Sequence, residues 1–268
     1  MNKFSLFLLL LSTAFGTAQN AETYFENIRN NEAQLTAFFS QMPKGGDLHH
    51  HYSGSVYAEP LIAYAIKNNF YLNLETLEVQ PQRGTDGIWE SFEMIQKNGA
   101  LPLYQQKIIE KWSIKDFNGI SYPSDKQFFE SFGKFEATIK GTFEQGLLEL
   151  KNRAIKEQVS YIETQLSTIP CDMNTEDLTP YNEELRSLVA KKDEKAVFKA
   201  LDQLFATFNK REAAKYAANF NTNFVAKMHN DLKIDDAQFT MRYQNFVLRL
   251  MEQVDLFKNL VIAFISAD

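Results

Sequence analysis

Short strand-like segments in this sequence stand singly between much longer helical stretches. The clearest covers residues 159–166, which alternate apolar and polar side chains and are rich in strand formers. Two others are expected at 47–51 and 240–248. Strands that are separated by helices cannot be joined by tight hairpins, so they pair in parallel through helical crossovers. The sequence therefore predicts an α/β fold built on a parallel sheet.

The remaining pattern is mostly helical. Apolar residues recur at helical spacing over 21–41, and a Pro-Lys-Gly-Gly stop follows at 43–46. Further expected elements are a helix after the turn at 53–55, a small hairpin within 69–90, helices at 88–98 and 101–112, a long helix from an N-cap at Ser124 to residue 156, charged helices over 176–229 and a final helix over 252–267. About three strands are too few for a closed eight-stranded barrel, so either strands are missed or the chain covers part of such a fold.

The N-terminus has the pattern of a signal peptide over residues 1–18. A short positive segment precedes a Leu-rich apolar run, and small residues at 16–18 stand before Gln19. The apolar run is short for a bilayer span, although an uncleaved anchor or a buried first helix is the alternative interpretation. The sequence predicts an exported, periplasmic or secreted protein that is not held in a membrane after cleavage, with a helical extension over 19–41.

Composition narrows the classes of partner. The 268 residues carry a net charge of -6 without a long basic run, so nucleic acid is not an expected partner, whereas a single nucleoside is compatible with a pocket. Cys171 is the only cysteine, which excludes an internal disulfide and a Cys-x-x-Cys zinc site. Cys171 itself is expected to be a small semi-buried residue and not a catalytic one.

Three of the four histidines are consecutive, at positions 49–51. In a strand, residues i and i+2 point to the same side, so His49 and His51 have the spacing of two ligands for one metal ion. Neutral imidazole is a common zinc ligand, and catalytic zinc sites usually have three protein ligands and one open position. A surface cluster of histidines has the same spacing, and spacing alone does not separate the two.

The residues around the histidines carry a longer pattern. It reads Met42-Pro43-Lys44-Gly45-Gly46-Asp47-Leu48-His49-His50-His51-Tyr52-Ser53-Gly54-Ser55. This string resembles the opening signature of the adenosine deaminase family, within the metal-dependent amidohydrolases, and its Met-Pro-Lys-Gly form is most similar to the secreted, growth-factor-type members. The segments 128–132 and 161–165 also resemble, respectively, a Phe-rich helix and the second barrel strand of that family.

The resemblance implies a (β/α)8 TIM barrel of which residues 42–268 are the N-terminal portion. It implies Zn²⁺ held by His49 and His51, and a purine nucleoside pocket that includes Ser53, Gly54, Phe128 and Phe132. The implied reaction is hydrolytic deamination of adenosine or a related nucleoside to inosine and ammonia, by a zinc-activated water that attacks C6 while a Glu protonates the ring. A homodimer through the N-terminal helices is also expected. Phe128 and Phe132 equally fit an ordinary i, i+4 core pair.

The chain also departs from the family pattern. Ser53 stands where an acidic residue commonly contacts the ribose, and Gln165 replaces a usual Arg, while Glu163 is expected to be a buried structural carboxylate. The family's third zinc histidine, its His-Ala-Gly-Glu segment and its metal-binding Asp belong to later strands. No catalytic residue is therefore expected in this chain, and His229 is predicted to be a solvated surface histidine.

Two other functions remain open on the sequence. A different amidohydrolase would use the same His-x-His pair for another substrate, and Ser53 favours that alternative. A non-catalytic binding or interaction protein is compatible with the long helical stretch 176–229.

Overall fold

The computed structural model describes residues 20–169 and 179–267. The predicted signal peptide over 1–18 and Cys171 lie outside the described residues. No helix within the described ranges is long and apolar enough to cross a membrane.

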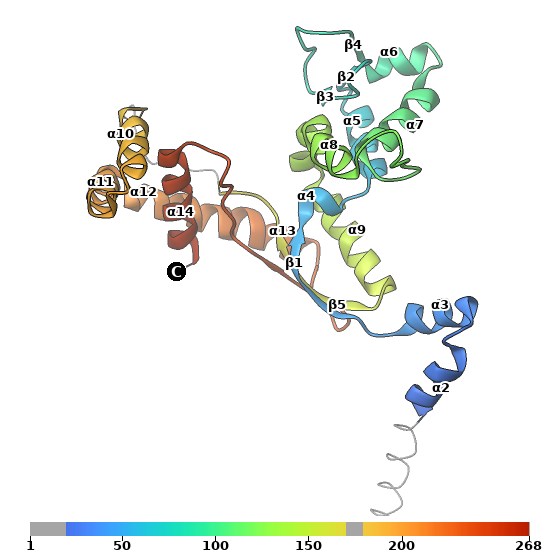
Figure 1. Cartoon of the computed structure of the whole chain (residues 1–268). Coiled ribbons are helices and arrows are strands. Elements are labelled where there is room, and N and C mark those ends of the chain that lie inside the picture. The colour runs from blue at the N-terminus through green and yellow to red at the C-terminus, as the bar shows by residue number, and fades with distance from the viewer. Residues whose placement is uncertain (1–19, 170–178, 268) are drawn as a thin grey trace, which may run out of the picture.

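A parallel sheet of three strands takes one strand from the N-terminal part, one from the middle and one from the C-terminal part of the described chain (Figure 1). It consists of β1 (Gly45–His51), β5 (Val159–Gln165) and β6 (Thr240–Tyr243), in the spatial order β1-β5-β6. The α/β class and the parallel pairing are confirmed. Over residues 20–169 and 179–267 the sheet is open and no barrel closes. The third strand is shorter than the predicted 240–248, because the chain leaves the sheet after Gln244, whose N–H still bonds the carbonyl of Thr164.

The crossover from β1 to β5 carries an inserted antiparallel sheet. Its elements are α4 (Tyr52–Ser55), α5 (Ala58–Lys67), β2 (Tyr71–Asn73), β3 (Val79–Gln80), β4 (Trp89–Ser91), α6 (Phe92–Lys97), α7 (Leu101–Trp112), α8 (Ser124–Ile139), the 3-10 turn η1 (Lys140–Thr142) and α9 (Phe143–Lys156). The three short strands have the order β3-β2-β4 where a hairpin is predicted. The predicted helix 124–156 is interrupted at η1, where Gly141 packs so closely on the Tyr64 ring that a Cβ would collide with it.

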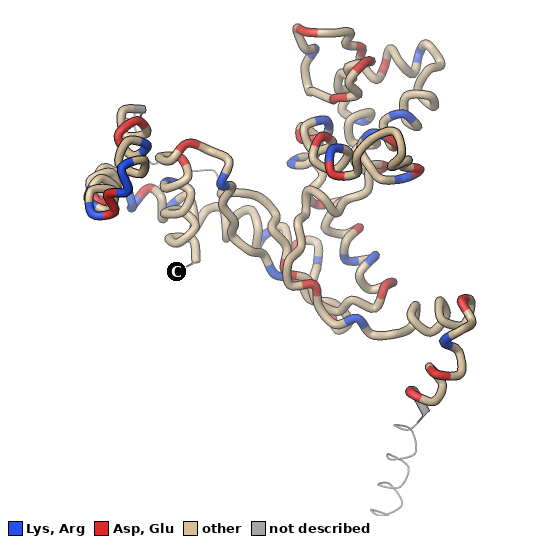
Figure 2. Tube along the Cα trace, viewed as in Figure 1, with Lys and Arg blue, Asp and Glu red and all other residues tan. Residues whose placement is uncertain are grey.

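The crossover from β5 to β6 is helical. It consists of α10 (Thr179–Ala190), α11 (Glu194–Thr207), α12 (Lys210–Asn219), the π-helix η2 (Phe220–Ala226) and α13 (Lys227–Asp231), and α14 (Gln253–Ala267) follows β6. Helices α12 and α14 pack beside α10 and α11 around a separate apolar core that contains Leu185, Leu204 and Val261. Figure 2 shows acidic and basic residues interspersed along most of the described helices, so neither positive nor negative charge is concentrated in one part of the fold.

The N-terminal extension is two helices where the sequence predicts one. Helix α2 (Asn20–Ile28) and α3 (Glu32–Gln41) form a hairpin that extends away from the rest of the molecule (Figure 1). The break occurs at Asn31, whose side chain caps α3 by accepting the N–H of Gln34 at 3.1 Å. Aromatic rings of both helices hold the hairpin together.

The two faces of the parallel sheet differ. Ile162, Thr164 and Met241 are buried beneath the helices, in a core that also includes Leu147 and Leu150 of α9. Side chains that alternate with them lie on the other face, which we call the open face. Any site on the sheet must therefore be built on the open face or at the strand ends.

Candidate metal site and adjoining cavity

His49 and His51 lie side by side at the C-terminal end of β1. Their Nε2 atoms are 3.1 Å apart and their ring centroids 4.9 Å apart, and both side chains are exposed. In the residue register, His51 pairs with Gln165, which alternates with the buried Thr164. The structure therefore brings the two predicted ligands together on the open face.

The spacing of the two nitrogens fits a shared metal ion. Two ligand atoms that each lie about 2.0–2.1 Å from a tetrahedral zinc ion are about 3.3 Å apart. The observed 3.1 Å is close to that value, and at this distance the two nitrogens hydrogen-bond each other, one donating and the other accepting. Within the described residues there is no cluster of three or more His, Cys, Asp or Glu side chains that could hold a metal ion. The site as described thus supplies two ligands.

His50 faces the opposite side of the sheet from its two neighbours. Its Nδ1 lies 2.9 Å from the hydroxyl oxygen of Thr164, on the helix-covered face. Burial lowers the pKa of His50, because the protonated ring would lose hydration there. This bond ties the end of β1 to β5 directly behind the pair of exposed imidazoles.

A cavity of about 580 Å³ opens two residues after His51. All four predicted substrate-binding residues line it, namely Ser53, Gly54, Phe128 and Phe132. Gly54 and Phe132 are in contact, since a Cβ on Gly54 would stand 3.4 Å from the Phe132 ring. Phe128 packs edge to face on Phe132 at 5.1 Å and remains 49% exposed. These aromatic side chains are therefore not a closed core pair, and they give the cavity an apolar wall with one accessible ring.

Arg153 of α9 holds the rim of this cavity. Its guanidinium donates to the carbonyl of Ser55 at 2.6 Å, pairs with Glu149 at 3.1 Å and lies over the Tyr57 ring at 4.4 Å. Burial raises the pKa of Glu149. Sequence analysis missed this arrangement, although the i, i+4 spacing of Glu149 and Arg153 on a helix was an available signal.

The opposite wall is fixed by Gln127. Its buried amide group donates to the carbonyls of Glu110, Lys111 and Ser113, at 3.0–3.1 Å, and so caps the C-terminal end of α7. No signal in the sequence marks this residue, since the carbonyls it bonds belong to a different helix.

Glu163 lies on the open face of β5 and is half-buried. One carboxylate oxygen accepts the hydroxyl of Tyr161 at 2.8 Å, and the other accepts the side-chain amide of Gln244 at 2.6 Å. The hydrogen bond to Glu163 raises the pKa of Tyr161. Glu163 is thus engaged by neighbouring side chains, but it is half-buried on the open face and not buried as expected.

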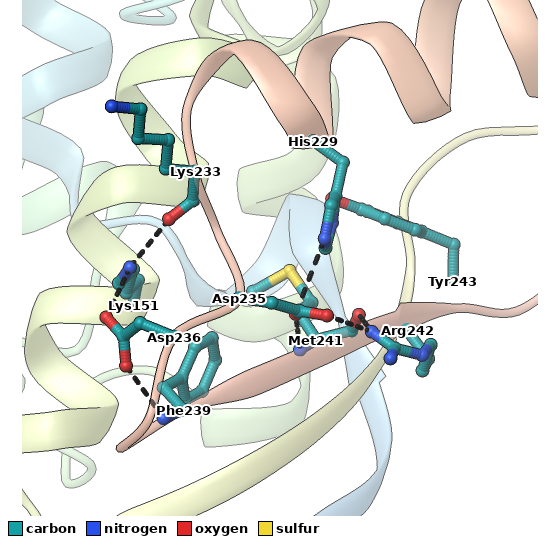
Figure 3. Close-up of polar contacts among 9 residues, drawn as sticks. All are labelled: Lys151, His229, Lys233, Asp235, Asp236, Phe239, Met241, Arg242 and Tyr243. Carbon is teal, nitrogen blue, oxygen red and sulfur yellow. Dashed lines mark hydrogen bonds and ion pairs between the residues drawn. The ribbon is translucent and has the colours of Figure 1, made fainter.

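The prediction that His229 is a solvated surface residue is wrong. Its side chain is only 16% exposed, with Nδ1 3.2 Å from the Tyr243 hydroxyl and Nε2 3.4 Å from Asp235 (Figure 3). The local sequence is charged, but the chain turns back after α13 and places β6 against this helix. His229 lies on the helix-covered side of β6. In the strand order β1-β5-β6, strand β5 separates β6 from the strand that carries His49 and His51.

No protein-family model matches the chain, and neither does any curated protein. The resemblance therefore depends on the sequence segments 42–55, 128–132 and 161–165.

Proposed function

We propose that this chain is the N-terminal portion of a zinc-dependent deaminase of the adenosine deaminase type, built on an amidohydrolase (β/α)8 barrel. The observation that carries the proposal is the pair of imidazole nitrogens 3.1 Å apart at the end of β1, directly before a cavity lined by Ser53, Gly54, Phe128 and Phe132. His51 and Ser53, which lines the cavity, are two residues apart in the segment that resembles the family signature.

The order of the sheet is consistent with the barrel. Strands of such a barrel pair in parallel in the order in which they occur, and functional residues follow their C-terminal ends. Here the order is β1-β5-β6, and both His51 and the cavity lie at the C-terminal end of β1. Three sequential strands also occur in open doubly wound sheets, so the barrel itself belongs to the proposal.

The residues present suggest how a purine nucleoside would bind. The exposed ring of Phe128 and the edge of Phe132, which packs beside Gly54, offer stacking surface for a base. The hydroxyl of Ser53 would bond a sugar hydroxyl. When bound, zinc would lower the pKa of a water molecule and so provide the nucleophile for deamination. His49 and His51 would hold the ion, and further ligands and the general acid must come from outside the described residues.

Zinc content is the most direct test. We expect a full-length protein that carries the remaining ligands to retain zinc after dialysis, and its His49→Ala/His51→Ala double variant to lose it. His50→Ala is the matched control, because His50 faces the other side of the sheet. Unchanged zinc stoichiometry in the double variant would refute the assignment.

The substrate class needs a separate assay. Adenosine, AMP, adenine and pterins should be compared for ammonia release by the full-length protein, with adenosine expected to react fastest. Preference for another member of this panel would favour a different amidohydrolase, an alternative that Ser53 supports. Zinc retention without any ammonia release would favour a binding protein.

A further inference from the structure

One extra residue in β1 decides which histidines face the open side of the sheet. Asp47 pairs with Ile162 and His50 pairs with Thr164, so three steps along β1 match two steps along β5. A strand that continued in step from Asp47 would place His49 opposite Thr164. A slip of one residue exchanges the two faces of a strand. Without the bulge, His49 and His51 would therefore turn toward the helices.

The bulge residues Leu48 and His49 use side chains to satisfy their backbone groups. The N–H of His49 donates to Oδ1 of Asp47 at 3.1 Å. The carbonyl of Leu48 accepts the side-chain amide of Gln244 at 3.1 Å, although 196 residues separate them. Gln244 is the residue directly after β6, so this bond crosses the whole sheet.

Gln244 is itself held in place by its neighbours. Its amide nitrogen also donates to Oε2 of Glu163 at 2.6 Å, while its backbone N–H bonds the carbonyl of Thr164 at 2.9 Å. The second oxygen of Glu163 accepts the Tyr161 hydroxyl. Both hydrogens of the Gln244 side-chain amide are therefore used, one on β5 and one on the bulge of β1.

We propose that Gln244 is a positioning residue for the metal pair: it holds the β1 bulge through Leu48 and so keeps His49 and His51 together on the open face. It contacts neither histidine. The proposal rests on the proposed function, because the arrangement matters only if these two imidazoles bind a metal ion.

Gln244→Glu tests the bond with little change of shape. The carboxylate cannot donate to Leu48 and is repelled by Glu163, so we expect zinc affinity to fall at least about tenfold, as for other residues that orient metal ligands. Competition with a chromophoric chelator measures the affinity. Gln203→Glu on the exposed face of α11 adds the same charge elsewhere and should leave the affinity unchanged.

A swap variant separates positioning from folding. In Glu163→Gln/Gln244→Glu, the two side chains can bond again with donor and acceptor exchanged, but the Leu48 carbonyl still lacks its donor. We expect the melting temperature to recover while zinc affinity remains low. Recovery of both would show that Gln244 acts only through overall stability and would overturn the proposal.

A measurement on the metal-free protein separates the role of Gln244 from the deaminase assignment. In the metal-free protein, NMR cross-peaks between the rings of His49 and His51 should be present and should disappear in Gln244→Glu. Persistence of these cross-peaks in a folded variant overturns the role of Gln244, whatever the metal result. Failure of the unchanged protein to bind zinc, with the cross-peaks lost in the variant, overturns the deaminase assignment but leaves the role of Gln244 in positioning the pair.

Discussion

The ammonium group of Lys44 lies 2.8 Å from the backbone carbonyl oxygen of Glu157, the C-cap residue of α9. The same group donates to the carbonyl of Phe39 in the last turn of α3, at 3.0 Å. One cation therefore compensates the carbonyl ends of two helices and ties the N-terminal hairpin to the start of β1. The Lys of the Pro-Lys signature has a structural role here.

Lys44→Met should loosen the N-terminal hairpin. Loss of two hydrogen bonds at exposed helix ends is expected to cost about 1 kcal/mol of unfolding free energy. Limited proteolysis should cleave faster between residues 20 and 43, and urea denaturation measures the stability. Lys195→Met, on exposed α11, is the control. Unchanged cleavage in Lys44→Met would contradict the role of this contact.

Asp236→Asn should reduce stability only above about pH 4. Lys151 pairs with Asp236 at 2.7 Å and lowers the pKa of Asp236, so its carboxylate favours the folded state above its unfolded pKa. That contribution is lost as pH falls through the folded pKa. The difference in melting temperature between the protein and the variant should therefore shrink from pH 7 to pH 3. A constant difference would show that the ion pair is not responsible.

Arg153→Met should destabilise the cavity rim. The change leaves the carbonyl of Ser55 without its donor and removes the charge beside Glu149, so we expect a loss of about 2 kcal/mol. In the Glu149→Gln background the loss should be smaller, because no half-buried carboxylate is left unpaired. A double-mutant cycle by denaturation measures the coupling, and additive losses would refute it.

Ser53→Asp should strengthen binding of adenosine if the cavity is a nucleoside site. A charge-assisted hydrogen bond to a sugar hydroxyl is stronger than a neutral one by about 1 kcal/mol or more, which is about a fivefold gain in affinity. Calorimetry with adenosine measures it, and adenine, which lacks the sugar, is the control ligand. Equal gains for both ligands would contradict a sugar contact.

The N-terminal hairpin is expected to mediate a homodimer. Tyr24 and Phe39 are 51% and 40% exposed on a hairpin that extends from the molecule, so apolar surface is available for a second copy. Tyr24→Ser/Phe39→Ser should convert dimer to monomer in analytical ultracentrifugation. An unchanged sedimentation coefficient, or a monomeric unchanged protein, would contradict the expectation.

Local patterns in the sequence predicted the elements that depend on local contacts. Strand β5 and helix α14 fall within one residue of the expected bounds, because alternation and helical spacing are set by neighbouring residues. The cavity residues also come together as the family resemblance implies. The break at Asn31 had a local signal, an Asn three residues before a Gln, which the longer apolar pattern obscured.

Features that depend on residues far apart in the chain could not be predicted from local sequence patterns. The bulge in β1 uses Gln244, and the burial of His229 depends on Tyr243 and Asp235. The side-chain hydrogen bonds to the backbone of β6 were also unexpected. Asp235 accepts the N–H of Met241 at 2.9 Å, and the Arg242 side chain donates to the carbonyl of Met241 at 2.6 Å. Burial raises the pKa of Asp235, but its bonds with Met241 and Arg242 outweigh this and lower it.

The parallel pairing of β1 with β5 also sets a delay during synthesis. His50 meets Thr164 across 114 residues, so β1 has no strand partner until that length of chain has been made. At ribosomal rates of about 5–20 residues per second, the delay is roughly 6–23 s. During that time the three imidazoles are attached to an unpaired segment and are free to bind metal ions in other geometries. If His49 and His51 bind zinc as proposed, the order of strands makes metal availability before β5 is complete, and not only in the folded protein, relevant to how this chain matures.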